Sequence, residues 1–128
     1  MKINTKFIFT SSAIFLGLLG IDLTFIPQEI ASFLGLPSGS SLFLQITGAL
    51  YFGFAMVNWT VRGSTIGGIY NRPIAIGNFS HFIIGALALI KFSFNNLDSI
   101  PILILTVFYA VFAVIFSLIV FTHPLKSS

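Results

Sequence analysis

Six polar side chains near the middle of this chain have the chemistry to bind a ligand in apolar surroundings. They are Asn58, Arg62, Tyr70, Arg72, Asn78 and His81. Arginine suits bidentate recognition of oxygen groups, and histidine can donate a hydrogen bond or move a proton near neutral pH. Because polar groups are costly inside a membrane, we treat them as candidates for function. We expect them to converge in a pocket, open to the inner leaflet or the cytoplasm, that holds an anionic or carbonyl-bearing headgroup.

The same side chains also have a purely structural interpretation. Asn58, Asn78 and His81 would then hydrogen-bond between helices and fix their register, while the arginines lie among lipid phosphates. The sequence leaves both interpretations open. It assigns no catalytic residue, because no carboxylate accompanies His81 at its depth as a partner for acid–base catalysis.

Asp22 is the candidate for proton coupling. It lies near the end of the first apolar segment, on the side opposite that segment's small residues. A carboxylate facing a cavity there would suit a small proton-coupled transporter, which is one alternative function. The other alternative is a membrane enzyme that acts on a lipid-like substrate. The structural interpretation pairs Asp22 with Lys91 or directs it to the lipid headgroups.

Several other chemistries find no support in the sequence. The chain has no cysteine, which removes disulfides, thiolate metal sites and iron–sulfur clusters. His81 and His123 belong to different apolar segments at different depths, so we expect no metal and no haem or other cofactor. The basic residues form no stripe, and we therefore expect no nucleic-acid partner.

The elements that must position these residues are membrane-spanning helices. Of 128 residues, 56% are hydrophobic and only 7% charged, and the mean hydropathy is +1.04. A soluble chain this short could not bury so much apolar surface. Four segments have the roughly 20 apolar residues that a spanning helix needs. They are residues 7–26, 42–61, 73–92 and 100–121, and together they form a single membrane domain over residues 1–128.

The basic residues predict how the helices are oriented. With a cytoplasmic N-terminus, five basic residues lie inside and only Lys91 lies outside, as the positive-inside rule requires. The inner residues are Lys2, Lys6, Arg62, Arg72 and Lys126. We therefore predict an all-α, up-down-up-down four-helix bundle with both termini in the cytoplasm, placed in a bacterial cytoplasmic membrane. The first helix is expected to stay uncleaved.

Small residues and turn residues predict the packing. In the first helix, one face carries Thr10, Ala13, Gly17, Gly20 and Thr24. In the second, Gln45, Gly48, Ala49, Phe52, Met56 and Trp59 share a face, with Asn58 on a flanking stripe. We expect small residues to mark packed faces and the fourth helix, apolar nearly all round, to be the most exposed to lipid. Between the first two helices, Pro27 could open a short amphipathic helix that Gly35 closes. It would lie at the membrane interface, as a lid or as a packing loop.

The chain resembles the DoxX-like group of small four-helix bacterial membrane proteins. The resemblance lies in the glycine-rich residues 17–21, the loop over residues 27–36 and the start of the second helix at residues 45–49. It implies a small accessory subunit near quinone-linked redox enzymes, or a protein without an assigned role. Together with the polar residues, the resemblance leads to our main hypothesis. The protein would bind a lipid, a quinone-like ligand, a partner subunit or a second copy of this chain.

Overall fold

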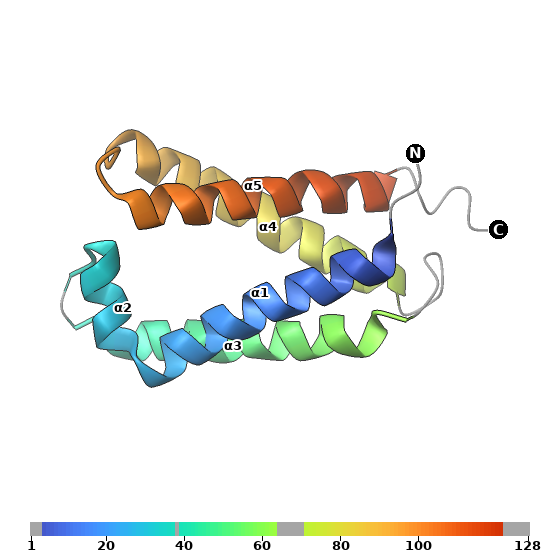
Figure 1. Cartoon of the computed structure of the whole chain (residues 1–128), viewed down its shortest axis with the longest axis horizontal. Coiled ribbons are helices and arrows are strands. Elements are labelled where there is room, and N and C mark those ends of the chain that lie inside the picture. The colour runs from blue at the N-terminus through green and yellow to red at the C-terminus, as the bar shows by residue number, and fades with distance from the viewer. Residues whose placement is uncertain (1–3, 38, 64–70, 122–128) are drawn as a thin grey trace. The chain divides into compact units, whose positions relative to one another are not determined.

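The computed structural model describes residues 4–37, 39–63 and 71–121. They form five helices: α1 (Thr5–Phe25), α2 (Pro27–Leu34), α3 (Ser41–Val61), α4 (Asn71–Phe94) and α5 (Ile100–Phe121) (Figure 1). All except α2 are long and apolar enough to cross a membrane. Helices occupy the four predicted spans to within two residues at each end, and the described part of the chain is all-helical.

The chain divides into two compact units. One comprises residues 7–62, and so contains nearly all of α1 together with α2 and α3. The other comprises residues 63–128 together with residues 1–6, and contains α4 and α5. The single membrane domain over residues 1–128 stays a prediction.

In the first unit, α1 and α3 approach each other closely at a pair of glycines. A methyl carbon placed on Gly20 would lie only 2.7 Å from the carbonyl oxygen of Gly48 and 2.8 Å from the backbone nitrogen of Phe52. A methyl carbon on Gly48 would lie 2.7 Å from the hydroxyl oxygen of Thr24. Neither position has room for a side chain. The predicted packing of the small face of α1 is therefore confirmed at Gly20 and Thr24.

Two polar contacts fix the register of this helix pair on either side of the glycines. The side-chain amide of Gln45 donates to the backbone carbonyl of Thr24 at 3.3 Å, and that of Asn58 donates to the Ser12 hydroxyl at 3.1 Å. The start of α3 thus meets the end of α1, and the end of α3 meets the start of α1. The two helices are antiparallel.

The packed face of α3 differs from the predicted one. Gly48 is buried as expected, but the other buried residues of α3 are Ala55 and Asn58, whereas Met56 and Trp59 are exposed. The contact face is therefore rotated toward the stripe that we assigned to its flank. The prediction was wrong for Met56 and Trp59, because large apolar side chains are as well placed in lipid as in a helix contact and so do not mark a packed face.

The short helix α2 begins and ends where the sequence predicts. Pro27 is its first residue, after the non-helical Ile26, and Gly35 closes it in the left-handed conformation at φ 75°. The amide of Leu36 donates to the carbonyl of Ala31 at 2.8 Å, and that of Gly35 donates to the carbonyl of Ser32 at 3.1 Å. This is the Schellman pattern, which satisfies carbonyl groups that would otherwise lack partners at a helix end.

In the second unit, α4 and α5 form an antiparallel hairpin. Phe79, near the start of α4, packs edge-on against Phe121 at the end of α5, and Ser93 meets Thr106 near the turn. In the turn itself, the Ser99 carbonyl accepts a hydrogen bond from the Leu103 amide at 3.1 Å, and α5 begins at the next residue.

The fourth spanning helix, α5, is not the most exposed one. It buries seven residues, among them Phe112, Phe116 and Ile119, whereas α3 buries three. Phe112 and Phe116 stack on Phe82 of α4, with ring centroids 4.9 and 5.7 Å away. The prediction that α5 is the helix most exposed to lipid is therefore wrong. The aromatic residues at this spacing pack against α4 instead.

Candidate functional site

The predicted site residues fall in different parts of the structure. Asn58 and Arg62 belong to the unit of residues 7–62, while Arg72, Asn78 and His81 belong to α4. Tyr70 lies outside the described residues. The structure thus describes two separate sets, and their convergence into one pocket stays a prediction.

Asn58 is fully buried and takes part in a chain of hydrogen bonds between helices. Its amide donates to Ser12, and the Ser12 hydroxyl in turn donates to the carbonyl of Phe9 at 3.0 Å. Ser12 was missed in the sequence, because a lone serine in an apolar helix gives no signal before its partner is known. This arrangement supports the structural interpretation for Asn58 (helix–helix hydrogen bonding).

Arg62 caps the end of α3. Its guanidinium carbon lies 3.8 Å from the centroid of the Trp59 ring, and one guanidinium nitrogen donates to the Trp59 carbonyl. A cation is stabilised at a helix C-terminus, where the last carbonyls concentrate negative potential, and also over an indole face. The stacked pair forms an amphipathic anchor of the type found at membrane interfaces.

His81 and Tyr109 form a polar pair within the α4–α5 hairpin. His81 Nε2 and the Tyr109 hydroxyl oxygen are 3.0 Å apart, which joins the two helices. His81 lies about 15 Å along α4 from its start, and Tyr109 about 14 Å along α5, so both lie near the middle of their helices. If α4 and α5 cross a bilayer, this pair lies near the middle of its hydrocarbon core, where polar groups are most costly.

The position of Tyr109 depends on Gly85. A methyl carbon at Gly85 would lie 2.5 Å from one carbon of the Tyr109 ring and 2.7 Å from another. The ring can lie across α4 only because this residue has no side chain. Tyr109 was also missed in the sequence, since we expected its helix to face lipid. A glycine one helical turn after His81 was the available signal.

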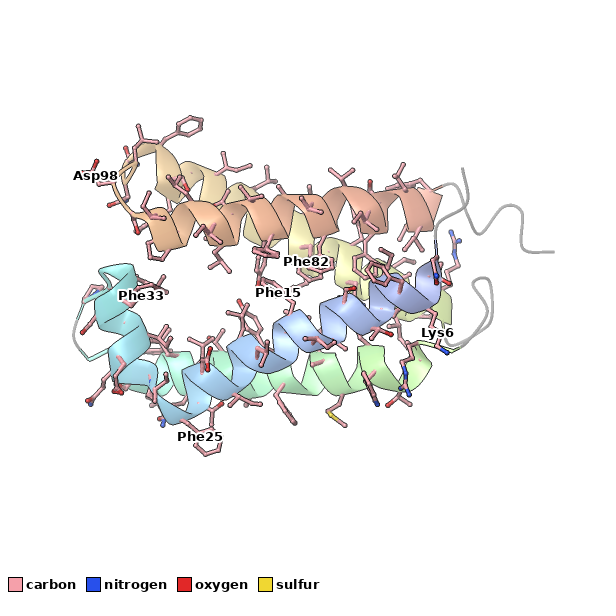
Figure 2. The ribbon with its side chains drawn as sticks, viewed as in Figure 1. Lys6, Phe15, Phe25, Phe33, Phe82 and Asp98 are labelled. Atoms are coloured by element: carbon pink, nitrogen blue, oxygen red, sulfur yellow. The ribbon has the colours of Figure 1, made fainter. Side chains whose placement is uncertain are left out.

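One aromatic ring lies beside both members of the pair. The ring of Phe82, which Figure 2 labels on α4, lies 5.0 Å from the His81 ring and 5.1 Å from that of Tyr109. Phe82 is fully buried, Tyr109 is buried, and His81 is half-buried. Apolar surroundings strengthen any hydrogen bond made there and are also suited to a flat, conjugated molecule.

The remaining candidates differ in their surroundings. The side chain of Asn78 is fully buried and donates to the carbonyl of Ile74 in its own helix at 2.9 Å. Arg72 is exposed in the first turn of α4. Asp22 is also exposed, near the end of α1, which places it away from the α1–α3 contact. Its pairing with Lys91 and its role in proton coupling both stay predictions.

One further polar contact was not predicted. The hydroxyl oxygens of Ser93 and Thr106 lie 3.1 Å apart, and Thr106 also donates to the carbonyl of Ile102 at 2.7 Å. The α4–α5 hairpin therefore has one polar contact near its turn and a second one, at His81 and Tyr109, near its middle. Within residues 4–37, 39–63 and 71–121, no three histidine, aspartate or glutamate residues are grouped closely enough to hold a metal ion.

The helices define the class of the protein. Four of them are long and apolar enough to cross a bilayer, which indicates an integral membrane protein. Comparison with family models gave no match, and neither the curated proteins nor the solved structures gave one. Any more specific function must therefore be argued from the residues themselves.

Proposed function

We propose that this chain is a small accessory protein of the membrane that binds a lipid, a quinone-like ligand or a partner subunit. Its binding group would be the pair formed by His81 and Tyr109 near the middle of the α4–α5 hairpin. The observation that carries the proposal is the hydrogen bond of 3.0 Å between them, which lies beside the buried ring of Phe82. Polar groups at this depth are costly and are retained mainly where they serve function or helix packing.

A carbonyl-bearing ligand suits the chemistry of this pair best. A neutral imidazole has one N–H donor and one acceptor nitrogen, and a phenol hydroxyl can both donate and accept. A ligand carbonyl has two lone pairs, so it could accept one hydrogen bond from the imidazole N–H and one from the phenol hydroxyl, and both side chains would remain hydrogen-bonded. The ring of Phe82, 5.0 Å from His81, offers a flat apolar surface beside such a carbonyl. These features favour a quinone-like head group over a cation or a sugar.

The proposed setting is a bacterial cytoplasmic membrane. The excess of basic residues predicted for the inner side supports an up-down-up-down bundle with both termini in the cytoplasm. The resemblance to DoxX-like proteins supports a position beside a quinone-linked redox enzyme. With these orientations, Arg62 and Arg72 lie at the cytoplasmic surface, where anionic lipid phosphates favour them.

Native mass spectrometry of the detergent-purified protein tests the proposal. The wild type is compared with His81→Ala and with Ser80→Ala, a neighbouring exposed residue that serves as the matched control. We expect a bound small molecule on the wild type and on Ser80→Ala, and its loss from His81→Ala. Circular dichroism of each variant verifies that the helices are retained.

Two results would contradict binding of a small ligand by this pair. A molecule that stays bound to His81→Ala would have its site elsewhere. If none of the three samples carries a bound molecule, the role of His81 and Tyr109 is to hold α4 against α5. A partner subunit would then be sought by copurification from mildly solubilised membranes, with His81→Ala again as the comparison.

A further inference from the structure

The short helix α2 divides its surface into three distinct sectors. Ala31 is buried, and the helix contacts α3. The polar residues Gln28, Glu29 and Ser32 lie together on another side and are exposed. Between these two sectors lies Phe33, whose side chain is 68% exposed. A helix with a protein-facing, a polar and an apolar exposed side is suited to the boundary between protein, water and lipid.

The chain places α2 at the end of a span. Only Ile26 separates the last residue of α1, Phe25, from the first residue of α2. Within the unit of residues 7–62, α2 runs crosswise to α1 and α3 at the ends where Phe25 and Ser41 lie (Figure 1). If α1 and α3 cross the bilayer, α2 lies along the membrane plane at its surface.

Exposed apolar side chains also lie where α1 ends. Phe25 is 77% exposed and Ile26 is 42% exposed. In Figure 2, Phe25 projects from the end of α1, and Phe33 projects from the part of α2 that is farther from the α1–α2 junction. Large exposed apolar groups beside a polar sector have their lowest free energy when water is excluded from them, and the covalent link to α1 keeps them at the depth of the lipid headgroups and upper acyl chains.

We propose that α2 is an interfacial lipid-binding helix whose Phe33, together with Phe25 and Ile26, inserts among the upper acyl chains of the outer leaflet. The occupant of this apolar surface is the bilayer itself. Gln28, Glu29 and Ser32 then face the water. Pro27 and the Gly35 cap limit the helix to a length that fits between the ends of α1 and α3. The inference concerns a surface separate from His81 and Tyr109, and it rests on α1 and α3 crossing the membrane.

Spin labelling tests this directly, because the chain has no cysteine of its own. Single-cysteine variants Phe33→Cys and Ser32→Cys carry a nitroxide in liposomes, and electron paramagnetic resonance measures collisions with oxygen and with a water-soluble nickel chelate. Oxygen concentrates in lipid, while the chelate stays in water. We expect the label at residue 33 to collide mainly with oxygen and the label at residue 32 mainly with the chelate.

The other outcomes would overturn the proposal. A label at residue 33 that collides mainly with the chelate would place Phe33 in water. A label shielded from both reagents would show that Phe33 packs against protein. If labelling perturbs the helix, the variant Phe33→Trp in a Trp59→Phe background is used in place of the spin-labelled protein. Its fluorescence should be quenched by lipids brominated near the headgroup, whereas that of Gln28→Trp in the same background should not. Equal, weak quenching of both would contradict insertion.

Discussion

At the scale of single residues, pairs of polar side chains join the long helices within each unit. Asn58 meets Ser12, His81 meets Tyr109, and Ser93 meets Thr106. Each pair joins two helices within one unit of the structure. An unsatisfied polar group in hydrocarbon costs several kcal/mol, so each partner lowers the cost of the other.

The Asn58–Ser12 contact can be measured with a double-mutant cycle. Ser12→Ala, Asn58→Ala and the double variant are unfolded by titrating lipid micelles with sodium dodecyl sulfate, and the loss of helix is followed by circular dichroism. We expect a favourable coupling of ~0.6–1.7 kcal/mol in the free energy of unfolding, the range found for hydrogen bonds between membrane helices.

A matched pair outside the contact serves as the control for this cycle. Ser11 and Thr60 lie beside Ser12 and near Asn58, and each donates to a carbonyl of its own helix. Ser11→Ala and Thr60→Ala should show no coupling. A coupling for Ser12 and Asn58 that is no larger than this control would mean that the hydrogen bond does not stabilise the hairpin.

At the scale of helices, the ends of each helix could be predicted from the sequence far better than the side of the helix that packs against its neighbour. The four spans were readable because the apolar runs are long and the turns carry proline, glycine and asparagine. The short helix α2 was readable from Pro27 and Gly35, which act through local backbone geometry. These signals need no knowledge of the partner helix.

The packed sides of α3 and α5 could not be predicted in the same way. In water, an apolar stripe marks the buried side of a helix, but lipid accepts Phe116 as readily as a neighbouring helix does. In lipid, only small and polar residues indicate which side of a helix is packed, as Gly20 and Thr24 did on α1. Tyr109 was missed for this reason, although Gly85 provides the space that it occupies.

The glycine contact between α1 and α3 gives a prediction at this scale. Gly20→Ala would place a methyl carbon 2.7 Å from a backbone oxygen of α3, so the helices must separate. We expect the free energy of unfolding to fall by about 1–3 kcal/mol. Gly53→Ala is the control, because no atom outside its own helix lies within 4 Å of a methyl carbon there. Equal stability of the two variants, measured by the same detergent titration, would contradict close packing at Gly20.

At the scale of the whole molecule, the direction of each span is the prediction that most needs a test. Single cysteines are introduced at the exposed residues Pro37, Gly63 and Asn96, and intact cells are treated with a membrane-impermeant maleimide. We expect Pro37→Cys and Asn96→Cys to react from outside, and Gly63→Cys to react only after the membrane is permeabilised. Reaction at Gly63→Cys in intact cells would show that the distribution of basic residues does not set the orientation.

The six residues of the predicted pocket mark the limit of sequence reasoning at this scale. Their types and depths could be predicted, but their neighbours depend on how each helix is rotated. Asn58 joins Ser12 and His81 joins Tyr109, and neither partner was among the residues that we chose. A cluster of polar residues predicted in a membrane chain therefore indicates which side chains need hydrogen-bonding partners. It does not indicate which residues those partners are.

The antiparallel pairing of α1 with α3 also affects how the protein is made. Every contact described between these helices, from Ser12 and Asn58 to Gly20 and Gly48, joins residues synthesised before α4. None of these contacts involves a residue that the ribosome adds later. The first hairpin can therefore close in the membrane while the second is still being translated, and α4 and α5 meet in the same way afterwards. Synthesis from the N-terminus would assemble this protein as two successive helical hairpins.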